Sequence, residues 1–226
     1  MIKDNVLEAR RRIQAACLRV KLDPAAVKLV AVSKNRSIEQ IKEAIFAGIT
    51  DFGENRVKEA VVKHRELSAT SHQPLAIKWH MVGHLQANKV KEAVRIFDLI
   101  HSVDSLRLIE EIDKQAARIN KIQDILVEVK TSPEATKSGI EPLQAAGVIK
   151  AAAKFKNVNV QGLMTIAPAV DNPEEARKYF RELSQLRGKI DPSFILSMGM
   201  SDDFEIAVEE GSNVIRIGRA IFQGGL

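Results

Sequence analysis

Apolar and polar positions follow a helical period over the first part of the chain. Between residues 2 and 20 the apolar side chains recur every three or four positions, with charged side chains between them. The apolar face consists of Ile2, Val6, Ala9, Ile13, Ala16, Cys17 and Val20. The pattern predicts an amphipathic N-terminal helix, in which Cys17 is a small core residue.

After this helix, short apolar runs alternate with longer amphipathic stretches to the end of the chain. The runs have the length and composition of buried strands, and the stretches have helical spacing. The predicted strands cover residues 29–33, 49–53, 77–82, 99–103, 125–130, 158–164, 194–198 and 214–217. The predicted helices between them cover about 37–47, 55–68, 86–96, 105–119, 141–155, 173–188 and 202–210.

Strict alternation of strand and helix predicts an α/β fold with parallel strands and crossover helices. Eight strands in 226 residues favour a closed (β/α)8 TIM barrel, with a doubly wound open sheet as the alternative. Only residues 223–226 follow the last apolar stretch, which leaves no room for a full eighth outer helix. We expect one domain over residues 1–226, with an N-terminal helix in residues 1–22 that fills this gap in the outer ring.

Composition narrows the class of protein. A hydrophobic content of 45% and a charged content of 28% are typical of a soluble globular domain. No apolar run approaches the length of a membrane-spanning helix, and the N-terminal segment lacks the apolar core of a secretory signal. The single cysteine cannot form an internal disulfide, which fits a reducing compartment. We therefore expect a cytoplasmic protein with no membrane partner.

The basic character of the chain does not predict nucleic-acid binding. The net charge is +5, but the 34 basic residues are interleaved with 29 acidic ones. One Trp and one Tyr provide no platform for stacked bases. We expect a monomer without a nucleic-acid partner.

Unusual residues gather at the carboxyl ends of the predicted strands, where barrels of this kind bind ligands. Lys34 follows the apolar run 27–33 directly. One interpretation is a lysine that extends from the strand end into solvent. The other is a partly desolvated amine that attacks a carbonyl and forms a Schiff base.

The loops after the last two strands have the composition of a phosphate site. Ser197 offers a hydroxyl, and Gly199 and Gly218 allow close approach of the backbone, although turn geometry alone would also explain these residues. The segment 201–203, Ser-Asp-Asp, is interpreted as a helix cap rather than a catalytic carboxylate pair.

Arg216 stands between two isoleucines inside an apolar strand. A guanidinium that faces the barrel interior needs an acceptor, which is either a buried ion-pair partner or a heteroatom of a ligand.

Two further patterns are set aside. His80 and His84 have a spacing that suits zinc on a helix, but here they span a strand end, so no metal is expected. Lys137-Ser138-Gly139 lacks the rest of a P-loop and is interpreted as a solvated turn.

Taken in order along the whole chain, these motifs resemble the pyridoxal phosphate homeostasis protein family, also called the YggS or PROSC family. The segments that carry the resemblance are AVSK at 31–34, FGEN at 52–55, WHMVGHLQANK at 79–89, TKSG at 136–139, GLM at 162–164, SMGMSDD at 197–203 and RIGRAIF at 216–222. The resemblance implies a barrel similar to the N-terminal domain of alanine racemase, and pyridoxal 5'-phosphate (PLP) as the cofactor.

The resemblance also implies roles for individual residues. Lys34 would hold PLP as a Schiff base, and Arg216 would face its pyridine nitrogen. Asn55 and His80 would line the ring, and the phosphate would bind at Ser197, Gly199, Gly218 and Arg219. Met164 and Met198 fall inside the matching segments and complete the expected cofactor-binding set.

The expected role is that of a carrier in PLP (vitamin B6) homeostasis, which buffers the cofactor or delivers it to apo-enzymes. An arginine does not take up a proton from the pyridine nitrogen, so the ring is a weaker electron sink. A racemase also needs a second acid–base group; the only tyrosine, Tyr179, falls in a predicted outer helix, and the chain ends directly after the barrel. A weak PLP-dependent racemase and a barrel without any ligand are the alternatives.

Overall fold

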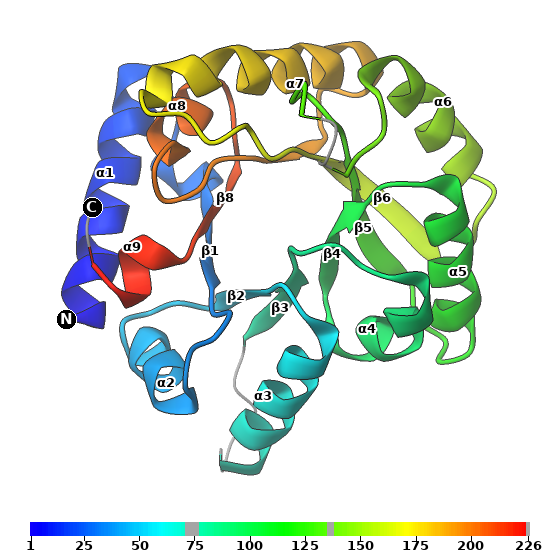
Figure 1. Ribbon diagram of the computed structural model, residues 1–226, viewed down its shortest axis with the longest axis horizontal. Coiled ribbons are helices and arrows are strands. Elements are labelled where there is room, and N and C mark those ends of the chain that lie inside the picture. Colours follow the sequence, from blue (N-terminus) through cyan, green and yellow to red (C-terminus); the bar gives the residue numbers. More distant parts are fainter. Residues whose placement is uncertain (71–76, 135–137, 225–226) are drawn as a thin grey trace.

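The residues described by the computed structural model, 1–70, 77–134 and 138–224, form eight parallel strands that close into a barrel in sequence order (Figure 1). The strands are β1 (Lys28–Val32), β2 (Asp51–Glu54), β3 (Lys78–Met81), β4 (Leu99–Val103), β5 (Gln123–Glu128), β6 (Val158–Met164), β7 (Ile195–Ser197) and β8 (Val214–Ile217). The closed barrel confirms the predicted fold and excludes the open sheet.

The helices form a ring outside the barrel. The α-helices are α1 (Ile2–Arg19), α2 (Ile38–Phe46), α3 (Val57–Thr70), α4 (Val90–Ile96), α5 (Leu106–Ala117), α6 (Pro142–Ala152), α7 (Arg177–Ile190), α8 (Phe204–Glu209) and α9 (Arg219–Phe222). Short 3-10 turns lie at η1 (Pro24–Ala26), η2 (Ala87–Lys89) and η3 (Pro173–Ala176).

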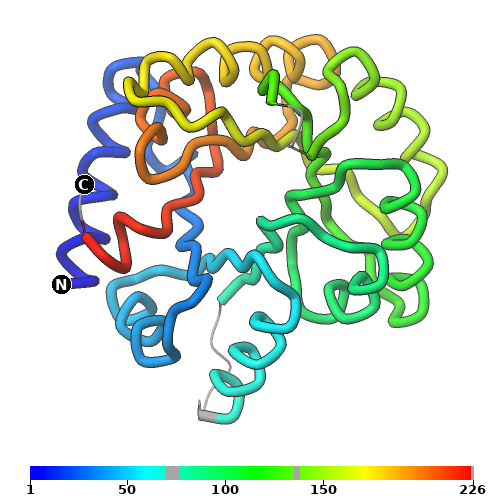
Figure 2. Tube along the Cα trace, in the orientation of Figure 1, coloured from blue at the N-terminus to red at the C-terminus, as the bar shows by residue number. Residues whose placement is uncertain are grey.

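Helix α1 closes the outer ring, as predicted. It packs against α8 and α9 on one side and α2 on the other, so the first and last helices lie side by side (Figure 2). The Asn5 side chain donates to the Ile221 carbonyl at 2.8 Å, and Arg19 pairs with Glu205 and Glu209. The helix after β8 has only four residues, so α1 covers the face that a longer helix would cover.

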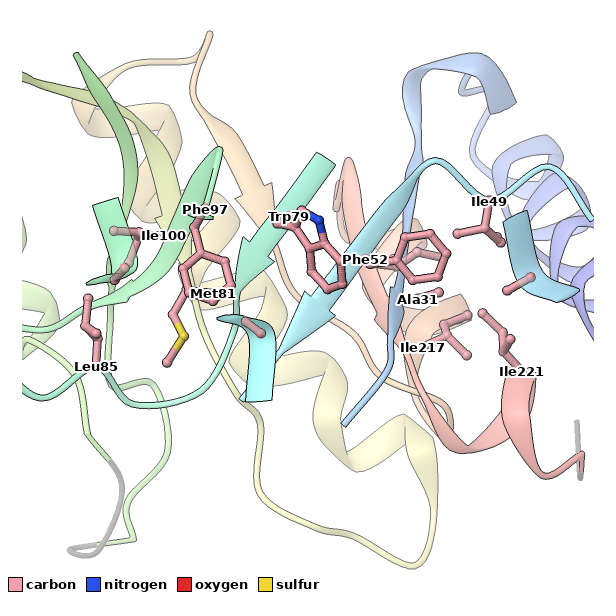
Figure 3. Packing of buried hydrophobic residues seen from close by; sticks show 14 of the residues in the cluster. Ala31, Ile49, Phe52, Trp79, Met81, Leu85, Phe97, Ile100, Ile217 and Ile221 are labelled. Atoms are coloured by element: carbon pink, nitrogen blue, oxygen red, sulfur yellow. The ribbon is translucent and has the colours of Figure 1, made fainter. Parts of the chain in front are cut away.

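The main apolar core lies between the barrel and the helices. Paired strand residues such as Ala31 with Phe52, and Phe52 with Trp79, turn the same way and pack outward under the helices (Figure 3). Because alternate residues point to the barrel interior, the outward core leaves the inward face free for other side chains. Among the described residues no helix is both long and apolar enough to cross a membrane.

Candidate functional site

The inward positions of the strands carry polar residues where barrels of this kind usually carry Val, Ile and Leu. Register places Glu128 beside Met164, Met164 beside Ser197, and His80 beside Gly53. Arg216 lies opposite Val30 on the neighbouring strand. By strand alternation, these residues lie at inward positions of the barrel.

A continuous chain of hydrogen bonds crosses the barrel interior. Asp51 Oδ1 lies 2.9 Å from His80 Nε2, and His80 Nδ1 lies 2.9 Å from His101 Nε2. His101 Nδ1 lies 2.8 Å from Ser197 Oγ, which accepts a bond of 2.5 Å from Arg216. The second terminal nitrogen of Arg216 donates to the Thr165 carbonyl at 2.9 Å. The chain therefore links the base of the barrel to its mouth.

The direction of donation is fixed at the two ends of this series of hydrogen bonds. Arginine only donates and a carboxylate only accepts, so Ser197 accepts from Arg216 and His80 Nε2–H donates to Asp51. Burial alone would raise the pKa of Asp51, but the bonds from His80 and Thr50 hold it well below its usual value. Burial, with the nearby His80 and Arg216, lowers the pKa of His101, which keeps that ring neutral.

Lys34 lies at the same mouth, in the turn after β1. Its side chain is exposed and has no hydrogen-bond or ion-pair partner among the described residues. The next residue, Asn35, has φ +56°, the left-handed conformation that Asn tolerates better than most residues. Lys34 thus projects from a tight turn with a free amine.

The loops after β7 and β8 lie against each other and against β1. Gly199 has φ +94°, and a Cβ there would lie 2.5 Å from the Ala207 Cβ, so α8 could not pack as it does around a larger residue. Gly218 borders β1, with its ideal Cβ position 3.2 Å from the Val32 carbonyl oxygen. Arg219 pairs with Asp202, which ties the two loops together.

A cavity of about 280 Å³ opens at the barrel mouth, and its described lining includes Asn55 but neither Lys34 nor Arg216. Its polar lining comes from the ends of β2, β3 and β5, and includes Asn55, His84, Glu128, Lys130 and Ser132. Glu128 is 6% exposed, and its carboxyl has no hydrogen-bond partner among the described residues. Burial and the nearby Asp104 raise the pKa of Glu128 to about 7, although the positive charge of Arg216 opposes the shift.

The raised pKa of Glu128 predicts a loss of stability as the pH rises. Between pH 4.5 and about 7 the unfolded chain releases this proton and the folded chain keeps it, so the free energy of unfolding falls with pH. The loss approaches roughly 3 kcal/mol above pH 7. Glu128→Gln is therefore expected to be more stable than wild type at pH 8 and nearly equal to it at pH 4. Urea unfolding across this range measures the difference.

The matched control is Glu110→Gln, which alters an exposed glutamate on α5. Its difference from wild type should stay within about 0.5 kcal/mol at every pH. A Glu128→Gln difference that did not change between pH 4 and pH 8 would contradict the prediction.

The structure brings most of the predicted cofactor residues to one mouth. Asn55 and Lys34 lie at the rim, and Met164 and Arg216 face the interior just below it. His80 lies deeper, with both ring nitrogens bonded within the barrel, so it reaches the mouth only through His101. The side chain of Met198 packs outward into the apolar core, which leaves only its backbone near the loop.

Two patterns were not assigned to the cofactor site, the His80 and His84 pair and the segment 137–139. His84 turns away from His80 and pairs with Asp104 at 3.4 Å. Within the described parts of the chain, no group of three or more His, Cys, Asp or Glu side chains has the arrangement of a metal site. Lys137 lies outside the described residues, whereas Ser138 borders the cavity.

Sequence reasoning missed His101 and Glu128. His101 is a polar residue inside the apolar run 99–103, and Glu128 interrupts the run 125–130 in the same way. An imidazole or carboxyl at an inward position of a barrel strand needs a partner or a ligand. The polar residue inside each apolar run could therefore have identified both residues as site candidates.

Comparisons with known proteins agree with the barrel fold and identify the family. The family described as "Alanine racemase, N-terminal domain" matches residues 2–224. A pyridoxal phosphate homeostasis protein of Aquifex aeolicus is 42% identical over 216 residues, which cover 93% of this chain and 92% of that protein. The crystal structure of a protein from Bifidobacterium adolescentis, described as unknown, has a TM-score of 0.91 at 34% identity, covering 98% of this chain and 94% of that one. PipY of Synechococcus elongatus, solved with PLP bound, has a TM-score of 0.80 at 35% identity, covering 98% and 100%.

Proposed function

Because this chain belongs to the alanine racemase N-terminal domain family, and within it to the pyridoxal phosphate homeostasis proteins, we propose that it binds PLP at the barrel mouth. Lys34 holds the cofactor as a reversible Schiff base, so that the chain buffers PLP or delivers it to apo-enzymes. The observation that carries the proposal is a free, exposed lysine at the same mouth as a buried arginine. The PLP-bound PipY structure supports the choice of ligand.

Arg216 fits the ring nitrogen of such a ligand. Two of its five N–H groups donate within the barrel, to Ser197 and Thr165, which leaves three for a ligand acceptor. Burial lowers the pKa of Arg216 to about 10, partly offset by Asp203 and Glu128, so it remains charged at neutral pH. It therefore orients an acceptor without taking up or releasing a proton.

The phosphate is assigned to the two loops that follow β7 and β8. Backbone N–H groups around Met198, Gly199 and Gly218 would bind it, because free N–H groups at such loops attract an anion. Ser197 and Arg219 complete this set, although each already has a partner in the protein. Asn55 and Met164 would border the ring, with His80 acting through His101 from below. The bound cofactor supplies an aldehyde carbon that an amine can attack.

We favour a carrier over an enzyme. The sole tyrosine, Tyr179, lies on the outer helix α7, where its ring packs beside the apolar core and Lys178. It cannot serve as an acid–base group at the mouth. A PLP-dependent racemase of low activity is the second candidate, favoured only by the family to which the chain belongs. We further propose a cytoplasmic monomer whose partners are PLP-dependent apo-enzymes rather than nucleic acids or membranes.

Uptake of PLP tests the proposal directly. Purified protein mixed with PLP is expected to turn yellow, and borohydride is expected to fix the cofactor on the peptide that contains Lys34. Peptide mass spectrometry identifies the modified residue. A protein that stays colourless and gains no mass would refute both the carrier and the enzyme.

The same preparation separates the carrier from the racemase. After incubation with L-alanine, a chiral assay should detect D-alanine only at a small fraction of ordinary enzyme rates. A turnover of about 1 per second or more would establish an enzyme instead.

A further inference from the structure

The turn that carries Lys34 is closed by its own backbone. The Arg36 N–H donates to the Ser33 carbonyl at 3.0 Å, which makes residues 33–36 a four-residue turn with Lys34 at its second position. Asn35 supplies the left-handed conformation at the third position. Such turns do not by themselves require charged partners.

Three charged residues nevertheless bind this turn on both sides of Lys34. Lys63 Nζ donates to the Ser33 carbonyl at 2.6 Å, and the Ser33 hydroxyl donates to Glu54 Oε1 at 2.6 Å. The Asn35 N–H donates to Glu59 Oε1, also at 2.6 Å. The residues before and after Lys34 are therefore both held, while the Lys34 side chain bonds to no residue that the structure describes.

The three charged residues also bind one another. Lys63 Nζ lies 2.8 Å from Glu54 Oε1 and 2.6 Å from Glu59 Oε1. The side chains of Lys63 and Glu54 are 7% and 0% exposed. The second oxygen of Glu54 is buried and has no hydrogen-bond partner within the described parts of the chain. Burial of an ion pair in this way is costly, and replacement by apolar residues often stabilises a protein.

Among the described residues, the charged groups of these three side chains bond only to one another and to the turn around Lys34, which points to a role in presenting that lysine. Formation of the Schiff base requires the neutral ε-amine to reach the aldehyde carbon; the C=N bond forms and the aldehyde oxygen leaves as water. Misplacement of a reacting group by about 1 Å can slow a reaction by about 100-fold. We propose that Glu54, Glu59 and Lys63 are positioning residues that hold the Lys34 amine at the aldehyde. The inference rests on the proposed function of Lys34.

Glu59 gives the sharpest test, because its side chain is partly exposed and its replacement leaves the Lys63–Glu54 pair in place. With PLP as the probe, stopped-flow absorbance should show that Glu59→Ala forms the Schiff base about 10- to 100-fold more slowly than wild type. Glu59→Gln keeps an oxygen for the Asn35 N–H and should be slowed less. The graded response tests whether the oxygen that accepts from the Asn35 N–H carries the effect.

Pyridoxine 5'-phosphate, which has an alcohol where PLP has the aldehyde, separates binding from bond formation. Its affinity should be equal within about threefold in wild type and both variants. The control Glu39→Ala alters an exposed glutamate on the neighbouring helix α2 and should react at the wild-type rate. Equal rates for wild type and Glu59→Ala would overturn this inference alone. A wild-type chain that takes up no PLP would overturn the proposed function.

Discussion

Lys34→Ala is expected to abolish covalent capture of PLP. The variant removes the free amine at the barrel mouth, so borohydride should leave no reduced adduct on this segment, and the yellow colour should fall to background. Because Lys34 is exposed and has no partner among the described residues, the free energy of unfolding should change by no more than about 0.5 kcal/mol. Absorbance, peptide mass spectrometry and urea unfolding measure the three quantities.

The matched control for this variant is Lys58→Ala, which removes another exposed lysine just beyond the same mouth, in the first turn of α3. It should capture PLP as wild type does. Affinity for pyridoxine 5'-phosphate should be retained by both variants, since Arg216 and the loop glycines are unchanged. An adduct of wild-type size in Lys34→Ala would show that a different lysine is the attachment site.

Most of the fold could be predicted because one unit repeats. Each apolar run is too short for a helix and each amphipathic stretch is too long for a strand, so the order of elements was clear. Some element boundaries differ from the prediction. The predicted second strand began at Ile49, but the Ile49 N–H donates to the Ala44 carbonyl and ends helix α2. Strand β2 therefore starts at Asp51, after the turn at Gly48.

The site could be predicted only in part, for a physical reason. Lys34 and Arg216 are visible in the sequence because a charge directly after or inside an apolar run has an evident cost. Lys63 gives no such signal. It lies four residues after Glu59 on a helix, a spacing that usually marks a solvated surface pair. Only the packing of α3 against the Lys34 turn shows that it is buried.

The hydrogen-bond series His80–His101–Ser197–Arg216 could not be predicted from the sequence for a related reason. Its members come from four strands spread over residues 80–216, and only barrel closure brings them together. Closure also joins these separate polar residues into one continuous series of hydrogen bonds. Arg216 is thereby held between Ser197 and Thr165 before any ligand binds, so a ligand acceptor meets a donor that is already oriented.

Lys63→Met is expected to have the largest effect on stability. It leaves Glu54, which is fully buried, without its cation, and breaking a buried pair in this way costs about 3–5 kcal/mol. Burial already raises the pKa of Glu54 against the opposing effect of Lys63, and the loss of Lys63 raises it further. The folded chain then keeps a proton that the unfolded chain releases, so the loss of stability should be greater at pH 8 than at pH 5. Urea unfolding at the two pH values measures it.

Two further variants decide whether the uncompensated charge is the cause. Lys63→Met combined with Glu54→Gln removes the buried carboxyl, and it should recover most of the loss at pH 8. Lys114→Met breaks an exposed pair with Glu111 at 3.8 Å and should cost less than about 1 kcal/mol. Failure of the double variant to recover stability would show that the Lys63 side chain acts through packing or its bond to the Ser33 carbonyl. The cluster would then stabilise the Lys34 turn by shape rather than by charge.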